Sequence, residues 1–255
     1  MPDARDRIVI SDVAQLFDVS TRRKFLKALG AGGSIVLLPS VFAACDDDDI
    51  IIDPPFEGVT LDLSDDTGIL NYAFALEQLE AAFYTAVIGS APFASFTDEE
   101  KEVFTDLRNH EVIHREFFRA VLGGNAIPDL AVEQSEVATA LASHDSILLT
   151  SETFEDLGVS AYNGAGKYLT SATNLLVAGK IVSVEARHAA AIRDLRDTDG
   201  EKFANSEVVN PMGLDVKLEP SLVLAAADPF IETEIAIDPG PTGTATANQA
   251  PTHSS

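Results

Sequence analysis

Residues 110–123, HEVIHREFFRAVLG, carry the signature Glu111-x-x-His114 inside a segment with apolar residues at helical spacing. A second copy, Glu185-x-x-His188, lies in residues 181–195, IVSVEARHAAAIRDL. In an α-helix, residues three apart are separated by roughly 4.5 Å along the axis and lean toward the same point. Each copy therefore directs one carboxylate and one imidazole inward from the same helix.

Two further glutamates complete the pattern. Glu77 and Glu155 are each followed by a tyrosine seven residues later. These are Tyr84 and Tyr162, and a separation of about two helical turns puts each one on the same face as its glutamate. One Glu from each of two helices and a Glu-x-x-His from each of two others form a carboxylate-bridged two-metal site in a four-helix bundle. We expect the tyrosine hydroxyls to hydrogen-bond to this site or to take part in its redox chemistry.

The proposed ligands interrupt apolar stripes that should face a protein core. The stripes are Leu70, Ala73, Phe74, Glu77, Ala81, Tyr84, Ile88; Phe104, Leu107, Glu111, His114, Phe118, Val121; and Ile181, Val184, Glu185, His188, Ile192, Leu195. The segment around Glu155 is less apolar. A buried carboxylate is rare unless it is paired or bound to a metal. Two divalent cations would balance the charge of four carboxylates and two neutral imidazoles.

Neighbouring acidic residues leave two ligand positions open. Glu80 and Glu152 lie one turn from Glu77 and Glu155 and could replace them as ligands. His110 is rotated by about 100° from Glu111, so we expect it to be exposed or to hydrogen-bond to a ligand.

Three stretches resemble one known family. They are LNYAFALEQLEAAFY from Leu70, HEVIHREFFRAVLG from His110 and EDLGVSAYNGA from Glu155, and they are similar to the ferritin-like domain family that includes desiccation-related proteins. The similarity covers about residues 63–200 and extends toward 232. It implies two metal ions, iron or manganese, held by Glu77, Glu111, His114, Glu155, Glu185 and His188. The Cys-x-x-Cys pairs of rubrerythrins are missing, which removes a built-in electron-transfer iron centre.

The predicted fold is all-α: a ferritin-like antiparallel four-helix bundle with one long crossover between helices 2 and 3, a short C-terminal helix and a disordered tail. Thr97 and Glu100 form a capping-box pattern that should begin the second helix, and Gly123 should end it. Pro220 should open the C-terminal helix. The expected segments are a leader at 1–44, an acidic tether at 45–62, the bundle at 63–200, an extension at 201–237 and the tail at 238–255.

The N-terminus predicts export. Arg22 and Arg23 lie in TRRKFLK, which matches the twin-arginine pattern, and the apolar stretch that follows is too short to span a membrane. Small residues precede Cys45, the single cysteine, as in a lipoprotein processing site. We expect export by the twin-arginine machinery to a periplasmic or other extracytoplasmic location, with a lipid on Cys45 as membrane anchor.

Composition and family together limit the function. A net charge of −24 argues against binding nucleic acid. The leading hypothesis is oxidative metal chemistry in stress protection, by a di-metal oxidoreductase similar to a ferroxidase or a manganese catalase. The alternative is a metal-sequestering or structural stress protein without turnover. The sequence leaves the oligomeric state open, with a homodimer as one candidate.

Overall fold

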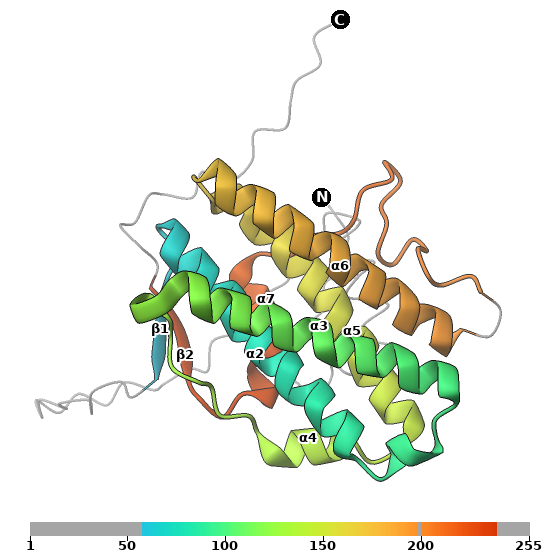
Figure 1. Cartoon of the computed structure of the whole chain (residues 1–255). Helices are drawn as coiled ribbons and strands as arrows, with labels where there is room; N and C mark the ends of the chain where they lie inside the picture. The colour runs from blue at the N-terminus through green and yellow to red at the C-terminus, as the bar shows by residue number, and fades with distance from the viewer. Residues whose placement is uncertain (1–57, 198–199, 239–255) are drawn as a thin grey trace, which may run out of the picture.

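The computed structural model describes residues 58–197 and 200–238, and its centre is a bundle of four long helices (Figure 1). The helices are α2 (Asp66–Gly89), α3 (Asp98–Leu122), α5 (His144–Ala165) and α6 (Ala172–Arg196). α2 packs chiefly against α3, and α5 against α6, so the bundle consists of two helical hairpins. The predicted four-helix architecture is confirmed. The predicted leader with Arg22, Arg23 and Cys45, most of the tether, and the tail from residue 239 lie outside the described residues.

Side-chain caps fix where the long helices begin. Thr97 and Glu100 form the predicted capping box at the start of α3, in which Thr97 N donates to Glu100 Oε2 at 2.7 Å. Gly123, with φ of 54°, ends α3 as predicted. Asp65 caps α2 through a 2.8 Å bond from Gly68 N. Each hairpin is closed by a short turn that contains a 3₁₀ segment, η3 (Pro92–Ser95) or η5 (Gly166–Tyr168).

The crossover from α3 to α5 is held to α2 by two buried amide side chains. It contains η4 (Gly123–Asn125) and a helix that was not predicted, α4 (Gln134–Ala140). Asn71 Oδ1 accepts from Ile127 N at 2.8 Å, and Gln78 Oε1 accepts from Leu130 N at 2.8 Å. Asn71 and Gln78 are seven residues apart and therefore share one face of α2. Their amides satisfy crossover backbone groups that would otherwise be buried without partners.

The chain after the bundle returns along α5. It forms α7 (Pro220–Ala227), which Pro220 opens as predicted, and η6 (Asp228–Phe230). Strand β2 (Ile235–Asp238) then pairs in parallel with β1 (Val59–Asp62), and Figure 1 shows the two strands side by side beyond the helices. These strands are a difference from the all-α prediction. They form because Val59 and Leu61 alternate inward against the core, so the last four residues of the expected tether belong to the folded domain.

Aromatic side chains fill one end of the bundle. Phe83 contacts Tyr84 and Phe154 edge-on, with ring centroids 5.2 and 5.0 Å apart, and Phe104 is fully buried. Val121 was predicted on the inner face of α3 but is 52% exposed, because it lies at the rim of an open pocket at the other end of the bundle. In residues 58–197 and 200–238, none of the helices is long and apolar enough to cross a membrane.

Candidate metal centre

The six predicted ligand residues meet in the middle of the bundle. Glu77 comes from α2, Glu155 from α5, and one Glu-x-x-His pair from each of α3 and α6. All four carboxylates, those of Glu77, Glu111, Glu155 and Glu185, are 0% exposed. His188 is buried and His114 is half-buried. The helical spacing therefore places the carboxylates inward, as the sequence predicted.

Two overlapping groups of ligand atoms lie within this cluster. One group contains Glu77, Glu111, His114 and Glu185, and the other contains Glu111, Glu155, Glu185 and His188; in each group, one ligand atom per residue lies within 4.8 Å of the others. Glu111 and Glu185 belong to both groups. The six residues of the two groups would hold divalent cations between them, with Glu111 and Glu185 available to both groups.

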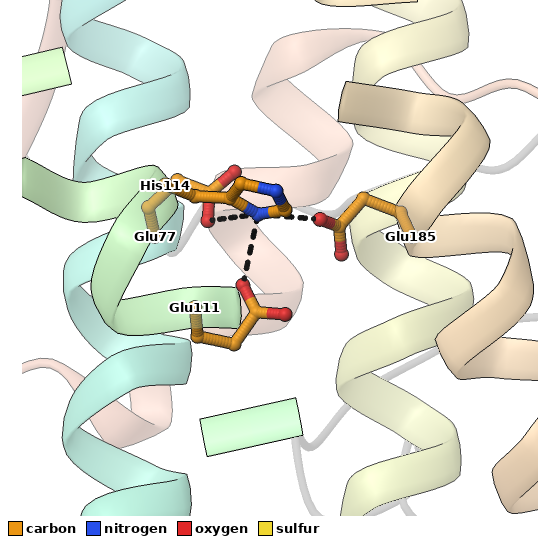
Figure 2. A group of neighbouring side chains, drawn as sticks. All are labelled: Glu77, Glu111, His114 and Glu185. Atoms are coloured by element: carbon orange, nitrogen blue, oxygen red, sulfur yellow. Dashed lines mark ion pairs between the residues drawn. The ribbon is translucent and has the colours of Figure 1, made fainter. Parts of the chain in front are cut away.

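The first group surrounds the imidazole of His114. Figure 2 shows the carboxylates of Glu77, Glu111 and Glu185 pointing toward this ring from three different helices. His114 Nδ1 lies 3.0 Å from Glu185 Oε1, 3.4 Å from Glu77 Oε2 and 3.5 Å from Glu111 Oε2. The Nδ1 atom, rather than Nε2, therefore faces the centre.

The second group has the same form around His188. His188 Nδ1 lies 2.8 Å from Glu111 Oε1, 3.4 Å from Glu155 Oε2 and 3.8 Å from Glu185 Oε2. The rings of His114 and His188 have centroids 6.3 Å apart. The two halves of the centre are thus related by an approximate twofold repeat that follows the repeated sequence pattern.

Many buried polar atoms of this cluster lack hydrogen-bond partners. Within the described part of the chain, they include both carboxylate oxygens of Glu111 and of Glu185, one oxygen each of Glu77 and Glu155, and Nδ1 of both histidines. Several of these nitrogen and oxygen atoms lie within ion-pair distance of one another, but their angles do not fit a hydrogen bond. Burying such atoms without a partner is costly. Their convergence fits bound cations, and oxygen and imidazole donors suit iron or manganese.

Without cations, the centre holds its charge balance through protons. Burial disfavours the charged imidazole, but the neighbouring carboxylates of Glu111, Glu185 and Glu77 outweigh it and raise the pKa of His114 to about 12. The pKa of His188 is raised as well, against burial, by Glu155 and Glu111. Burial raises the pKa of Glu155 to about 8. The two imidazolium groups therefore supply positive charge that metal ions would replace.

The two predicted tyrosines cross from one hairpin to the other. Tyr84 Oη donates to Glu155 Oε1 at 2.6 Å, and Tyr162 Oη donates to Glu77 Oε1. Each bond leaves the second oxygen of its carboxylate facing the centre. The prediction that the tyrosines would hydrogen-bond to the site residues is confirmed, whereas a redox role stays a prediction.

His110 contacts a member of the cluster, although it is exposed. His110 Nδ1 lies 2.9 Å from His188 Nε2, and the two rings are stacked at 5.1 Å between centroids. This contact uses the ring nitrogen of His188 that faces away from the centre. If His188 offers Nδ1 to a metal, its Nε2 carries the proton and donates to His110. The expectation that His110 would be exposed or bond to a ligand is confirmed.

The two alternative carboxylates have different surroundings. Glu152 forms an ion pair with Arg196, which directs its carboxylate away from the cluster. Glu80 is buried close to the cluster but lies outside both ligand groups. Burial, followed by the charges of Glu111 and Glu185, raises the pKa of Glu80 well above its usual range. The geometry thus favours Glu77 and Glu155 as ligands and makes Glu80 a neutral neighbour, a distinction that spacing alone could not supply.

The fold and the cluster together define a class: helical-bundle proteins with a buried carboxylate and histidine centre that permits divalent metal binding. Within that class, a model of the ferritin-like domain family matches residues 65–198, and the chain belongs to this family. The resemblance identified from the sequence is confirmed. A search of curated proteins found no match.

Proposed function

We propose that this protein binds two divalent ions, iron or manganese, and uses them for redox chemistry with dioxygen or peroxide. The observation that carries the proposal is the pair of ligand groups that share Glu111 and Glu185. A single cation would use one group and leave Glu155 or Glu77 without a role. Two cations use all six residues and compensate the four buried carboxylates.

The protein supplies position, charge and exclusion of water. Glu111 and Glu185, which belong to both ligand groups, would help to hold both ions, Glu77 and Glu155 would add a carboxylate to one group each, and His114 and His188 would each add a neutral nitrogen. Tyr84 and Tyr162 hold the carboxylates of Glu155 and Glu77 in one orientation. Iron, when bound, would supply electrons for the reduction of dioxygen, and manganese would pass two electrons from one peroxide molecule, which becomes dioxygen, to a second, which becomes water.

The direct test combines metal analysis with turnover. We expect about two metal ions per chain after expression with iron or manganese, and consumption of dioxygen or peroxide by the loaded protein. The variant Glu111→Gln keeps the size of the side chain but removes a charge that both ligand groups share, so it should lose metal and turnover. Metal binding at this stoichiometry without turnover would instead support a sequestering or structural stress protein. Failure to bind either metal would overturn both readings.

We also propose that the protein acts outside the cytoplasm, in stress protection, attached by a lipid on Cys45. Support comes from the twin-arginine pattern at Arg22 and Arg23 and from the small residues before the single cysteine. Replacement of Arg22 and Arg23 by lysine should leave the precursor in the cytoplasm. The variant Cys45→Ala should be exported but released from membranes. Normal fractionation of both variants would contradict this proposal.

A further inference from the structure

A cavity of about 270 Å³ lies inside the bundle next to the metal centre. Side chains from all four long helices surround it, and nearly all of them are apolar; Ala73, Leu76, Phe118, Ala161, Val177 and Ala178 are representative. Tyr162 also lines the cavity, and its hydroxyl donates to Glu77. One tyrosine therefore connects the cavity wall with a proposed metal ligand.

The cavity results from small residues at positions where the repeated half has large ones. Phe104 precedes Glu111 by seven residues, and the matching position before Glu185 is Ala178. Phe104 is fully buried beside Tyr84, with ring centroids 5.9 Å apart. Ala178 instead lines open space beside Tyr162. A phenylalanine side chain is thus missing from one half of an otherwise repeated core.

A second pair of matching positions shows the same difference, with phenylalanine in one half and alanine in the other. Phe83 precedes Tyr84, whereas Ala161 precedes Tyr162. Phe83 is buried against Phe154, while Ala161 lines the cavity. Protein interiors are otherwise close-packed, and a cavity this large costs stability. Alanine stands at both of these positions on the same side of the centre, so two matched differences between the halves leave the space open.

The cavity reaches the surface between α3 and α6. Phe117 and Val121 line it from α3 and are 37% and 52% exposed, and Thr173 lines it from α6 and is exposed. Figure 1 shows α3 and α6 running along the same side of the bundle. A molecule can therefore reach Tyr162 through this opening without separation of the two hairpins.

We propose that this cavity binds a small, uncharged organic molecule with an apolar body, packed against Tyr162 beside the candidate metal centre. A cavity of 150 Å³ holds benzene, so 270 Å³ accommodates roughly ten carbon atoms. The net charge of −24 and the apolar wall both disfavour an anionic ligand such as a fatty acid. The inference extends the proposed function but does not rest on it, because binding requires only the cavity.

Calorimetric titration of the full chain with 1-alkanols of increasing length tests this inference. Affinity should rise by about fourfold per added CH₂ group until the cavity is filled at about ten carbons, and then level off. The matching carboxylates should bind at least about tenfold more weakly than the alcohols. The measurement should be made on both the metal-free and the metal-loaded protein, so that failure of metal binding does not affect it.

Two variants fill the space that the missing rings leave open. Ala178→Phe and, separately, Ala161→Leu should each weaken decanol binding about tenfold or more while the metal content stays unchanged. Gly179→Ala is the matched control on α6, because its added Cβ would meet no atom within 4 Å, and it should bind decanol normally. Thermal unfolding shows whether each variant is folded. If one variant fails to fold, the decanol affinity of the other variant tests the proposal. The proposal would be overturned if the protein took up xenon but bound no alkanol. It would also be overturned if both folded variants bound decanol as tightly as the Gly179→Ala control.

Discussion

Tyr84 and Glu155 join the two helical hairpins by a buried hydrogen bond of 2.6 Å, from the hydroxyl on α2 to Oε1 on α5. Tyr162 and Glu77 form the reciprocal bond between the same two helices. These bonds place each tyrosine in the hairpin opposite to the carboxylate that it orients. The centre is therefore assembled only when both hairpins have packed together.

The two tyrosine bonds should differ in their contribution to stability. Tyr84 lies among Phe83 and Phe104, whereas Tyr162 borders the cavity, where water can replace a lost hydroxyl. Tyr84→Phe should lower the free energy of unfolding by about 1–3 kcal/mol, and Tyr162→Phe by less. Urea unfolding of the two metal-loaded variants measures the difference. A larger loss for Tyr162→Phe would contradict this reading of the cavity.

His110→Ala should weaken metal binding although His110 is no proposed ligand. His110 lies 2.9 Å from His188 Nε2, so its loss frees the ring that would offer Nδ1 to the metal. Loss of such a partner typically costs about 10- to 100-fold in metal affinity. Competition with a chelator measures the affinity. His144→Ala is the control, because His144 pairs with Glu100 away from the cluster, and it should bind metal normally.

Metal binding should release protons and should remove most of the pH dependence of stability. In the metal-free protein the pKa of Glu155 is about 8 and that of His114 about 12, both above their unfolded values. Groups of this kind stabilise the fold fully below their unfolded pKa values, and this contribution is lost as pH rises through the folded values. The metal-free protein should therefore become less stable from about pH 5 to pH 8.

Loading with Mn(II) should remove most of this decline, because the cation displaces the protons. Binding at pH 7 should release protons from His114, His188, Glu155 and Glu77, the four proposed ligands whose pKa values are raised. Calorimetry in buffers of different ionisation enthalpy gives the number. Thermal unfolding of both forms across this pH range gives the stability curves, and a metal-free protein whose stability increased with pH would contradict the assignment of these protons.

Much of the centre could be predicted from the sequence because helical periodicity is a local property. Glu111 and His114 lie one turn apart, so their common direction follows from the helix alone. The same reasoning could not choose between Glu77 and Glu80, since both are buried and the choice depends on which carboxylate reaches the opposite hairpin. The contact of His110 with His188 likewise depends on how α3 packs against α6.

The elements that were not predicted depend on contacts between distant parts of the chain. Val59 pairs with Ile235 across nearly the whole described sequence, and no local pattern of four residues specifies such a partner. The cavity was not predicted either, although Ala178 can be read directly from the sequence. Ala178 indicates open space only by comparison with Phe104 at the matching position, and this comparison is informative only once the two halves are known to share one core.

Two glycines on neighbouring helices should respond in opposite ways to the same substitution. A Cβ on Gly164 of α5 would lie 1.7 Å from the carbonyl oxygen of Leu218, where the returning chain bonds to Ser160 at 3.0 Å. Gly164→Ala must therefore displace this backbone, and a loss of about 2 kcal/mol or more in the free energy of unfolding is expected. Gly179→Ala on α6 meets open space and should gain up to about 1 kcal/mol from helix propensity.

Urea unfolding of the two variants beside the parent protein measures both changes. Limited proteolysis adds a local readout, because Gly164→Ala should expose the chain between α6 and α7 to cleavage while leaving the four-helix core intact. The Gly179→Ala variant should show the parent pattern. Equal stability of the two variants would mean that the segment around Leu218 does not pack on α5. The conclusion that the returning chain stabilises α5 would then be wrong.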